Sequence, residues 1–428
     1  MLDKLFQTIE KITPLKYRWI LNHEGFKRYF ANTGWMFFGQ MFSLLVSFFI
    51  GAWLARYLGP ENYGVLSYAV AFVGLFGFIS SFGVDGVLSR ELVRFPEQRD
   101  KLLGTAFGLK LFGGSLAIIL AISSAFIFER NGLIRLLIIL FTAPFILQSI
   151  NVISTYFQAE VKSKNNVRAL LSATLISSAL KVLVIMLDKG VIWLIVVFAL
   201  DALWQGIGFV IAYKRCGLKI MDWRFTKYFS GKILGESWPL MLASAAGFIY
   251  LRIDQVIIGA LLGNYEVGIY AAAVKVVEVG YFVPVIICSS LFPAIINAKK
   301  IGEEFYHLRL RRFYLLMLGI PAIIAVPVTF FAKPIIIILF GPEYLPAVIV
   351  LQVYIWSSIG FFLGMAVSQY LLAENKSSFI FYINVFAMVV NIGLNLILIP
   401  TYGLLGAAFA TFISYLVIPL SVFLSRRK

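Results

Sequence analysis

Residues 237–262 read SWPLMLASAAGFIYLRIDQVIIGALL, and this stretch decides the fold class of the chain. It is long enough to cross the roughly 30 Å hydrocarbon core of a bilayer as a single helix. Two charges, Arg252 and Asp254, nevertheless lie near its middle, where each costs about 3 kcal/mol to insert. Charges in such segments face the interior of a helix bundle or a water-filled path. The stretch therefore predicts a membrane helix that borders a polar path.

The composition places the whole chain in the same class. Of its 428 residues, 61% are hydrophobic and 14% are charged, which is the balance of a polytopic membrane protein. Apolar runs long enough to span a bilayer fall in the first half at 32–55, 63–84, 104–128, 133–157, 169–187 and 191–213. In the second half they fall at 237–262, 267–296, 313–332, 345–372, 377–399 and 402–424. We expect an all-α polytopic fold of about twelve transmembrane helices.

The positive charges predict the orientation of these helices. Of the lysines and arginines between the segments, 28 fall on the side of the two termini and five in the opposite gaps. Positive residues accumulate in cytoplasmic loops, so both termini are expected in the cytoplasm and the protein in the inner, cytoplasmic membrane. The same distribution accounts for the net charge of +16 without a nucleic-acid partner.

The chain divides into two similar halves. Residues 32–213 and 236–428 each hold six predicted helices, and the basic segment 214–235 is expected to link them in the cytoplasm. LGPENYG at 58–64 follows the first crossing and LGNYEVG at 262–268 follows the seventh. Because an even number of crossings separates these turns, the halves predict two six-helix lobes related by a pseudo-twofold axis along the membrane normal. Residues 1–31 are expected to form an amphipathic segment at the cytoplasmic interface.

Several classes of protein and site are disfavoured by the sequence. It has no G-x-x-x-x-G-K-[ST] loop, so we expect no direct use of ATP. Cys216 and Cys288 lie far apart, which indicates neither a disulfide framework nor a metal site, and no cofactor is expected. The gaps opposite the termini are short, which disfavours an enzyme such as a membrane glycosyltransferase or polymerase with a catalytic loop there.

Three motifs stand out in the chain: ARYLGPENYG at 55–64, the stretch from RID at 252–254 to GIYAAA at 268–273, and YGLLGAA at 402–408. Together they resemble the motifs of the Wzx-type polysaccharide or lipid-linked oligosaccharide flippases of the MOP exporter superfamily. The resemblance runs from about residue 32 to the C-terminus. It implies a MOP/MATE-like carrier that moves a polyprenyl-diphosphate-linked glycan, such as an O-antigen, capsule or exopolysaccharide repeat unit, from the cytoplasmic to the outer leaflet. It also implies alternating access around a cationic cavity.

A diphosphate requires positive charge along its path, and four bases lie inside predicted helices. We predict that they form a cationic substrate cavity: Arg252, Lys181, Lys275 and Lys110. Alternatives stay open, because Arg252 can pair with an acid on a neighbouring helix, Lys275 can pair with Glu278 three residues on, and Lys110 can snorkel to the interface.

Four acids also lie within or at the ends of the predicted helices. Asp254, Glu278, Asp201 and Asp85 are predicted to be ion-coupling sites for a proton or sodium ion, or charge partners of the bases. Asp201 is placed to pair with Lys181. Helical periodicity turns Asp254 away from Arg252, so Asp254 needs a partner elsewhere.

Uncharged polar residues follow helical faces and suit contacts with sugar hydroxyls. We predict glycan contacts from the fourth, eleventh and first helices: Gln148, Asn151, Thr155, Gln158, Asn391, Asn395 and Gln40. Each of them is equally suited to hydrogen bonds between helices, worth about 0.6 kcal/mol apiece.

Two partner classes follow from these predictions, and one rival function remains. The expected partners are membrane lipid with the lipid-linked glycan, and other polysaccharide assembly proteins. A MATE-like, ion-coupled multidrug exporter shares the two-lobe plan, but carboxylates rather than bases would line its path to bind cationic drugs. Four bases against four acids do not decide between the two functions.

Overall fold

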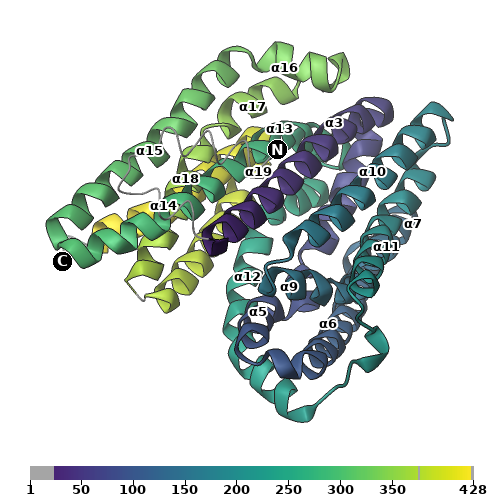
Figure 1. Cartoon of the computed structure of the whole chain (residues 1–428). Coiled ribbons are helices and arrows are strands. Elements are labelled where there is room, and N and C mark those ends of the chain that lie inside the picture. The colour runs from purple at the N-terminus through teal and green to yellow at the C-terminus, as the bar shows by residue number, and fades with distance from the viewer. Residues whose placement is uncertain (1–23, 375, 426–428) are drawn as a thin grey trace.

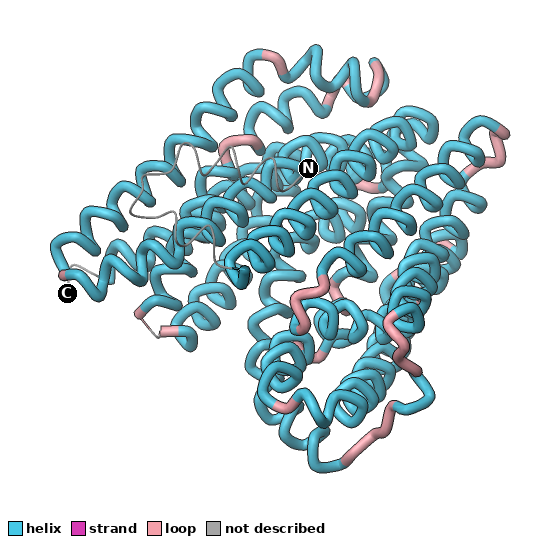
Figure 2. Tube along the Cα trace, in the orientation of Figure 1, coloured by secondary structure: helices cyan, strands magenta, loops and turns pink. Residues whose placement is uncertain are grey.

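The computed structural model describes residues 24–374 and 376–425, which form helices joined by short loops and no strand (Figures 1 and 2). The helices of the first half are α3 (Glu24–Gly74), α4 (Gly77–Ser81), α5 (Val84–Arg94), α6 (Arg99–Phe128), α7 (Gly132–Thr142), α8 (Pro144–Leu147), η3 (Gln148–Asn151), α9 (Val152–Ala159), α10 (Ser163–Met186) and α11 (Val191–Arg215). Those of the second half are α12 (Lys227–Leu261), α13 (Asn264–Glu278), α14 (Phe282–Ile301), α15 (Glu303–Phe330), α16 (Ala332–Leu339), α17 (Ala347–Tyr354), α18 (Ser357–Ala373) and α19 (Ser377–Ser425). The all-α prediction is confirmed.

The described helices contain ten apolar stretches that are long enough to cross a membrane. Two of the stretches, Asn32–Gly74 and Phe379–Phe423, have 43 and 45 residues, whereas one crossing needs about 20. Each contains a glycine with non-helical backbone angles, Gly59 in α3 and Gly403 in α19. Glycine accepts their positive φ without the strain that a side chain would add. Each long stretch is therefore divided at a glycine, which agrees with the prediction of about twelve crossings.

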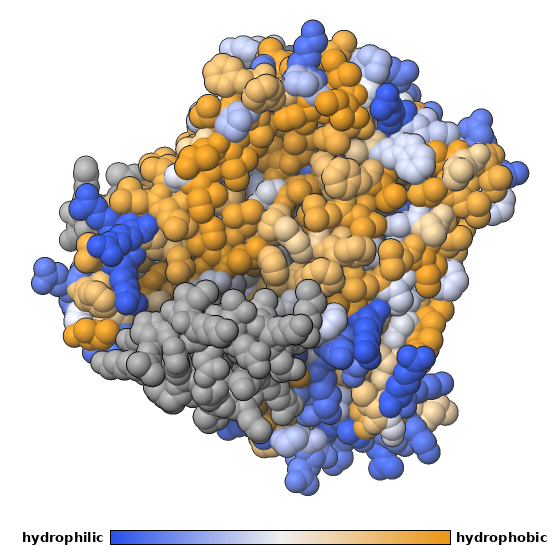
Figure 3. Space-filling model, turned by 45° about the horizontal axis from the view of Figure 1, so that its top comes forward, coloured by the Kyte–Doolittle hydropathy of each residue, from blue (hydrophilic) through white to orange (hydrophobic). Residues whose placement is uncertain are grey.

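The outer surface of the bundle suits lipid. Large apolar side chains such as Phe112 and Ile323 are more than half exposed, and Figure 3 shows a broad hydrophobic area between hydrophilic margins. A water-soluble protein would bury such side chains, whereas hydrocarbon solvates them. These surfaces agree with a multi-pass membrane protein.

The two lobes join at the end where the predicted outward turns lie. There α3 crosses α13 so closely that a Cβ on Gly64 would collide with the Asn264 carbonyl oxygen, and one on Gly268 with the Pro60 carbonyl oxygen. Small residues allow helix backbones to approach this closely. Nearby, the buried Tyr344 hydroxyl donates to the Ala55 carbonyl oxygen at 2.7 Å. One hydrophobic core runs through both lobes at this end.

At the opposite end the lobes have separate cores. Residues of α5, α6, α9 and the end of α11 form one core, and residues of α14, α15 and α18 form another. In Figure 1, α5, α6 and α9 lie well apart from α14 and α15. The molecule is therefore closed at the end of the outward turns and divided at the end of the predicted cytoplasmic loops.

Helix α12 bridges the divided end. It begins at Lys227, within the segment predicted as a linker, and its first turns place Phe229 and Ile233 in the core of the first lobe. Ion pairs join it to α5: Lys232 Nζ lies 2.5 Å from a Glu91 oxygen, and Arg90 pairs with Glu236. The predicted interfacial segment 1–31 lies mostly outside the described residues.

Replacing Gly268 by alanine places a methyl group against the Pro60 carbonyl, so α3 and α13 must move apart. We expect a loss of about 1–3 kcal/mol of stability, as for other overpacked contacts, seen as a lower thermal unfolding midpoint in detergent. Gly319→Ala in α15 is the control, since open space surrounds that glycine. Equal unfolding midpoints for the two variants would contradict the close crossing.

Candidate functional site

A cavity of about 490 Å³ lies within the first lobe, and we call it the lysine cavity. Residues of α3, α7, α8, η3, α10 and α11 form most of its wall, and α13 of the second lobe adds Lys275. Its polar lining consists of Ser47, Gln148, Thr174, Ser177, Ser178, Lys181, Asp201, Gln205 and Lys275. The structure thus brings together two of the four predicted bases.

Lys181 of α10 is held in place by α11. Its ammonium lies 2.7 Å from an Asp201 oxygen, which confirms the predicted pairing, and Ser177 also donates to Asp201. The same ammonium lies 3.9 Å from the centre of the Phe198 ring, a cation–π contact. Phe198 was not predicted from the sequence as part of the site, although it precedes Asp201 by three residues and so lies on the same face of the helix.

Lys275 reaches the lysine cavity through a notch in α3. A Cβ on Gly51 would collide with the Lys275 ammonium, so glycine at this position leaves the space that the side chain occupies. The ammonium lies 6.0 Å from the centre of the Tyr63 ring. Among the described residues, no carboxylate lies within ion-pair distance of it. Lys275 therefore brings to the cavity a positive charge that these residues leave unneutralised.

A second cavity, of about 560 Å³, lies nearer the divided end of the molecule, and we call it the amide cavity. Its lining includes Asn151, Ser154, Thr155 and Gln158 from η3 and α9, and Asp85 from α5. Gln205 of α11 lines both cavities, which places them next to each other.

The fourth membrane segment runs along both cavities. Pro144 interrupts its helix, and the residues Gln148–Asn151 form a tighter 3₁₀ turn. Gln148 faces the lysine cavity, while Asn151, Thr155 and Gln158 face the amide cavity. The whole predicted stripe therefore lies at a cavity wall, although its role in binding a glycan stays a prediction.

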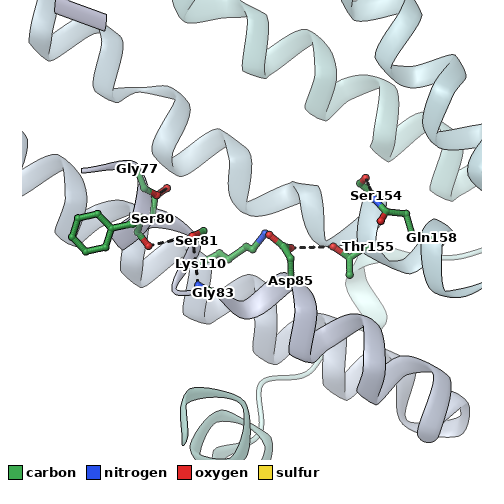
Figure 4. Close-up of polar contacts among 10 residues, drawn as sticks. Gly77, Ser80, Ser81, Gly83, Asp85, Lys110, Ser154, Thr155 and Gln158 are labelled. Atoms are coloured by element: carbon green, nitrogen blue, oxygen red, sulfur yellow. Dashed lines mark hydrogen bonds and ion pairs between the residues drawn. The ribbon is translucent and has the colours of Figure 1, made fainter. Parts of the chain in front are cut away.

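Asp85 and Lys110 form an ion pair at the edge of the amide cavity (Figure 4). Lys110 Nζ lies 2.5 Å from Asp85 Oδ1, and the Thr155 hydroxyl donates to the same oxygen at 3.0 Å. The Lys110 side chain is buried, so the structure places this base behind Asp85 and not in the cavity wall.

Arg252 and Asp254 point in opposite directions from α12, as predicted. Arg252 lies against Gly74 of the first lobe and pairs with Glu278 at 3.3 Å. Glu278 therefore pairs with Arg252 instead of Lys275, the local partner that the sequence offered. Asp254 is buried inside the second lobe, where it accepts a hydrogen bond from the Tyr270 hydroxyl at 2.6 Å.

Three predicted glycan contacts lie away from both cavities. Asn391 and Asn395 are buried between the two halves of α19, where Asn391 donates to Ser414 at 2.8 Å and Asn395 donates to Asn391. Gln40 is exposed on α3. The alternative of hydrogen bonds between helices fits the two asparagines, because both are fully buried and bond to polar groups within α19.

The sequence matches two family models. The model described as polysaccharide biosynthesis protein matches residues 29–299, more than half of the chain. The MatE model matches residues 239–397.

Two named proteins are similar in sequence to this chain. A Shigella flexneri protein named "Putative O-antigen transporter" is 25% identical over 401 residues, covering 88% of this chain and 92% of the relative. A Haloferax volcanii protein named "Probable low-salt glycan biosynthesis flippase Agl15" is 28% identical over 180 residues. That match covers 41% of this chain and only 38% of the relative.

Two solved structures share the fold. Lipid II flippase MurJ in an inward closed conformation has a TM-score of 0.71 at 16% identity, covering 91% of this chain and 87% of that chain. An inward-facing MATE family multidrug resistance transporter of the MOP superfamily has a TM-score of 0.65 at 15% identity, covering 90% and 94%. The chain therefore belongs to the polysaccharide biosynthesis protein family and has the all-α fold of the MOP superfamily transporters.

Proposed function

We propose that this protein is a flippase, a transporter and not an enzyme, that moves a polyprenyl-diphosphate-linked oligosaccharide from the cytoplasmic to the outer leaflet of the inner membrane. The relatives named for O-antigen transport and glycan flipping support this substrate class. The observation that carries the proposal is the meeting of Lys181 and Lys275, from opposite lobes, in one cavity.

The diphosphate binds between these two lysines. Ammonium groups donate hydrogen bonds to phosphate oxygens, and burial strengthens each of these charged contacts. Lys181 already balances Asp201, whereas the charge of Lys275 is open to a ligand. The phosphates therefore supply the negative charge that Lys275 needs. Arg252, paired with Glu278 outside the cavity wall, remains a predicted contact for other stages of transport.

Alternating access is supported by the position of Lys275, which belongs to the second lobe but lines a cavity of the first. A ligand that binds Lys275 of the second lobe and Lys181 of the first is held by both lobes, so its binding changes the energy of moving one lobe against the other. The divided end admits the substrate from the cytoplasm, where both termini are expected from the positive-inside rule. The polyprenyl tail stays in lipid, and polysaccharide assembly proteins act before and after this step.

The charge of the lysine cavity weighs against export of cationic drugs. A cation would meet two ammonium groups and one carboxylate, and like charges in a poorly solvated site repel. The MatE match covers a smaller part of the chain than the polysaccharide family match does. A multidrug exporter is therefore the weaker alternative.

Lys275→Met should slow glycolipid movement about 10- to 100-fold, the loss expected when one hydrogen bond to a charged group worth about 1.5–3 kcal/mol disappears. The measurement is the rate at which a fluorescent polyprenyl-diphosphate oligosaccharide crosses liposomes that contain purified protein. Lys275→Arg keeps the charge and should retain much of the rate. Lys333→Ala removes an exposed lysine away from the cavity and should change nothing.

Two results would contradict the proposal. One is full activity of Lys275→Met. The other is ion-driven movement of a cationic dye in liposomes that do not move the glycolipid, since that is the behaviour of a multidrug exporter.

We further propose that a coupling cation, a proton or sodium ion, binds at Asp254. The carboxylate is buried, and no lysine or arginine among the described residues forms an ion pair with it. Hydrogen bonds from Tyr270 and from the backbone N–H of Gln255 stabilise it only in part. A buried carboxylate without a cationic partner is costly, and binding a cation removes that cost.

Asp254→Asn should remove the acceleration of transport by a sodium or proton gradient. The neutral amide does not bind a sodium ion or a proton in the way that a carboxylate does. Transport down the glycolipid gradient should continue. Asp188→Asn is the matched control, since Asp188 also accepts a tyrosine hydroxyl, from Tyr57 at 2.6 Å, but is exposed. The measurement is the rate of glycolipid transport with a sodium gradient and then with a proton gradient. If a gradient still accelerates transport by Asp254→Asn, the coupling cation does not bind at Asp254.

A further inference from the structure

The amide cavity contains one charged group among the described residues that line it, the carboxylate of Asp85. Its side chain is 52% exposed, although it pairs with Lys110. The Lys110 side chain, by contrast, is only 6% exposed. A ligand in the cavity therefore meets the negative end of this ion pair, while the positive end is shielded behind it.

The carboxylate is held in a fixed orientation. Lys110 Nζ and the Thr155 hydroxyl both donate to Oδ1, from α6 and α9 respectively. Figure 4 shows the contact with Thr155 as a dashed line, with Lys110 on the other side of Asp85. Among the described residues, no donor bonds to the other oxygen, Oδ2. An acceptor fixed in this way loses little conformational entropy when a ligand binds. Asp85 is thus prepared to accept a hydrogen bond from a ligand.

We propose that Asp85 determines which sugars the protein accepts next to the diphosphate: uncharged or amino-substituted sugars, and not sugars that carry a carboxylate. This inference rests on the proposed function, because it assumes that the diphosphate occupies the lysine cavity. Gln205 lines both cavities, so the sugar joined to the diphosphate enters the amide cavity.

The chemistry of the lining supports this selectivity. Sugar hydroxyls, amide N–H groups and ammonium groups donate to the free carboxylate oxygen, and the side chains of Asn151, Gln158 and Gln205 both donate and accept. A sugar carboxylate would bring a second negative charge beside Asp85 with no exposed base of the cavity lining to neutralise it. Discrimination of this kind rests on repulsion as much as on attraction.

The test uses three probes that share a farnesyl diphosphate group: farnesyl diphosphate alone, its glucose conjugate and its glucuronic acid conjugate. The two sugars differ only in the replacement of a CH₂OH group by a carboxylate. Binding to the purified full-length protein is measured by titration calorimetry. We expect the glucose probe to bind about tenfold or more tightly than the glucuronic acid probe, the effect of one hydrogen bond to a charged group.

Asp85→Asn should reduce that ratio to one or below while leaving the affinity for farnesyl diphosphate unchanged. Because this variant leaves Lys110 buried without its partner, the double variant Asp85→Asn with Lys110→Met removes both charges together and guards against misfolding. It should also give a ratio near one. Lys275→Met is the control, and it should weaken both sugar probes by the same factor.

The outcomes separate the two proposals. A wild-type ratio near one, or a ratio unchanged in both Asp85 variants, overturns the role of Asp85 while binding of farnesyl diphosphate upholds the lysine site. Failure of farnesyl diphosphate itself to bind the wild-type protein overturns the proposed function and this inference with it.

Discussion

Charge inside a membrane must be neutralised, and this constraint organises the structure. Lys181 pairs with Asp201, Lys110 with Asp85, and Arg252 with Glu278. The described residues offer no such carboxylate to Lys275, which reaches from the second lobe past Gly51 into a cavity of the first. A phosphate group is the kind of ligand that completes such a site. In the proposed mechanism, substrate binding and the relation between the lobes are therefore linked through one side chain.

The packing of the lobes gives this link a mechanical consequence. At one end, Gly64 and Gly268 allow backbones of the two lobes to touch, and a single core unites them. At the other end each lobe has its own core, bridged by the first turns of α12 and its ion pairs with α5. Of these pairs, Arg90–Glu236 is exposed, whereas the Glu91 side chain that pairs with Lys232 is buried. In the proposed mechanism, the divided end opens and closes, while the glycine crossing keeps the other end shut until the lobes move.

The sequence predicted much of this arrangement because periodicity and composition operate within one helix. The opposite directions of Arg252 and Asp254 followed from helical spacing. The pairing of Lys181 with Asp201 joins two helices, and it was predicted because Asp201 lies deep in the helix that follows that of Lys181. Contacts between helices were harder to predict. Glu278 is three residues from Lys275, yet it pairs with Arg252, since the crossing of α12 and α13 decides which base is nearer. Asn391 and Asn395 resemble the stripe of the fourth helix, but spacing does not reveal whether a polar face meets a cavity or another helix.

A structure of the protein with a bound polyprenyl diphosphate, determined by cryo-electron microscopy in lipid nanodiscs, would show where the diphosphate binds. We expect the phosphates between the ammonium groups of Lys181 and Lys275, with the first sugar position facing Gln205 and the tail leaving toward lipid. Phosphates bound elsewhere, with Lys275 turned away from them, would contradict the proposed diphosphate site.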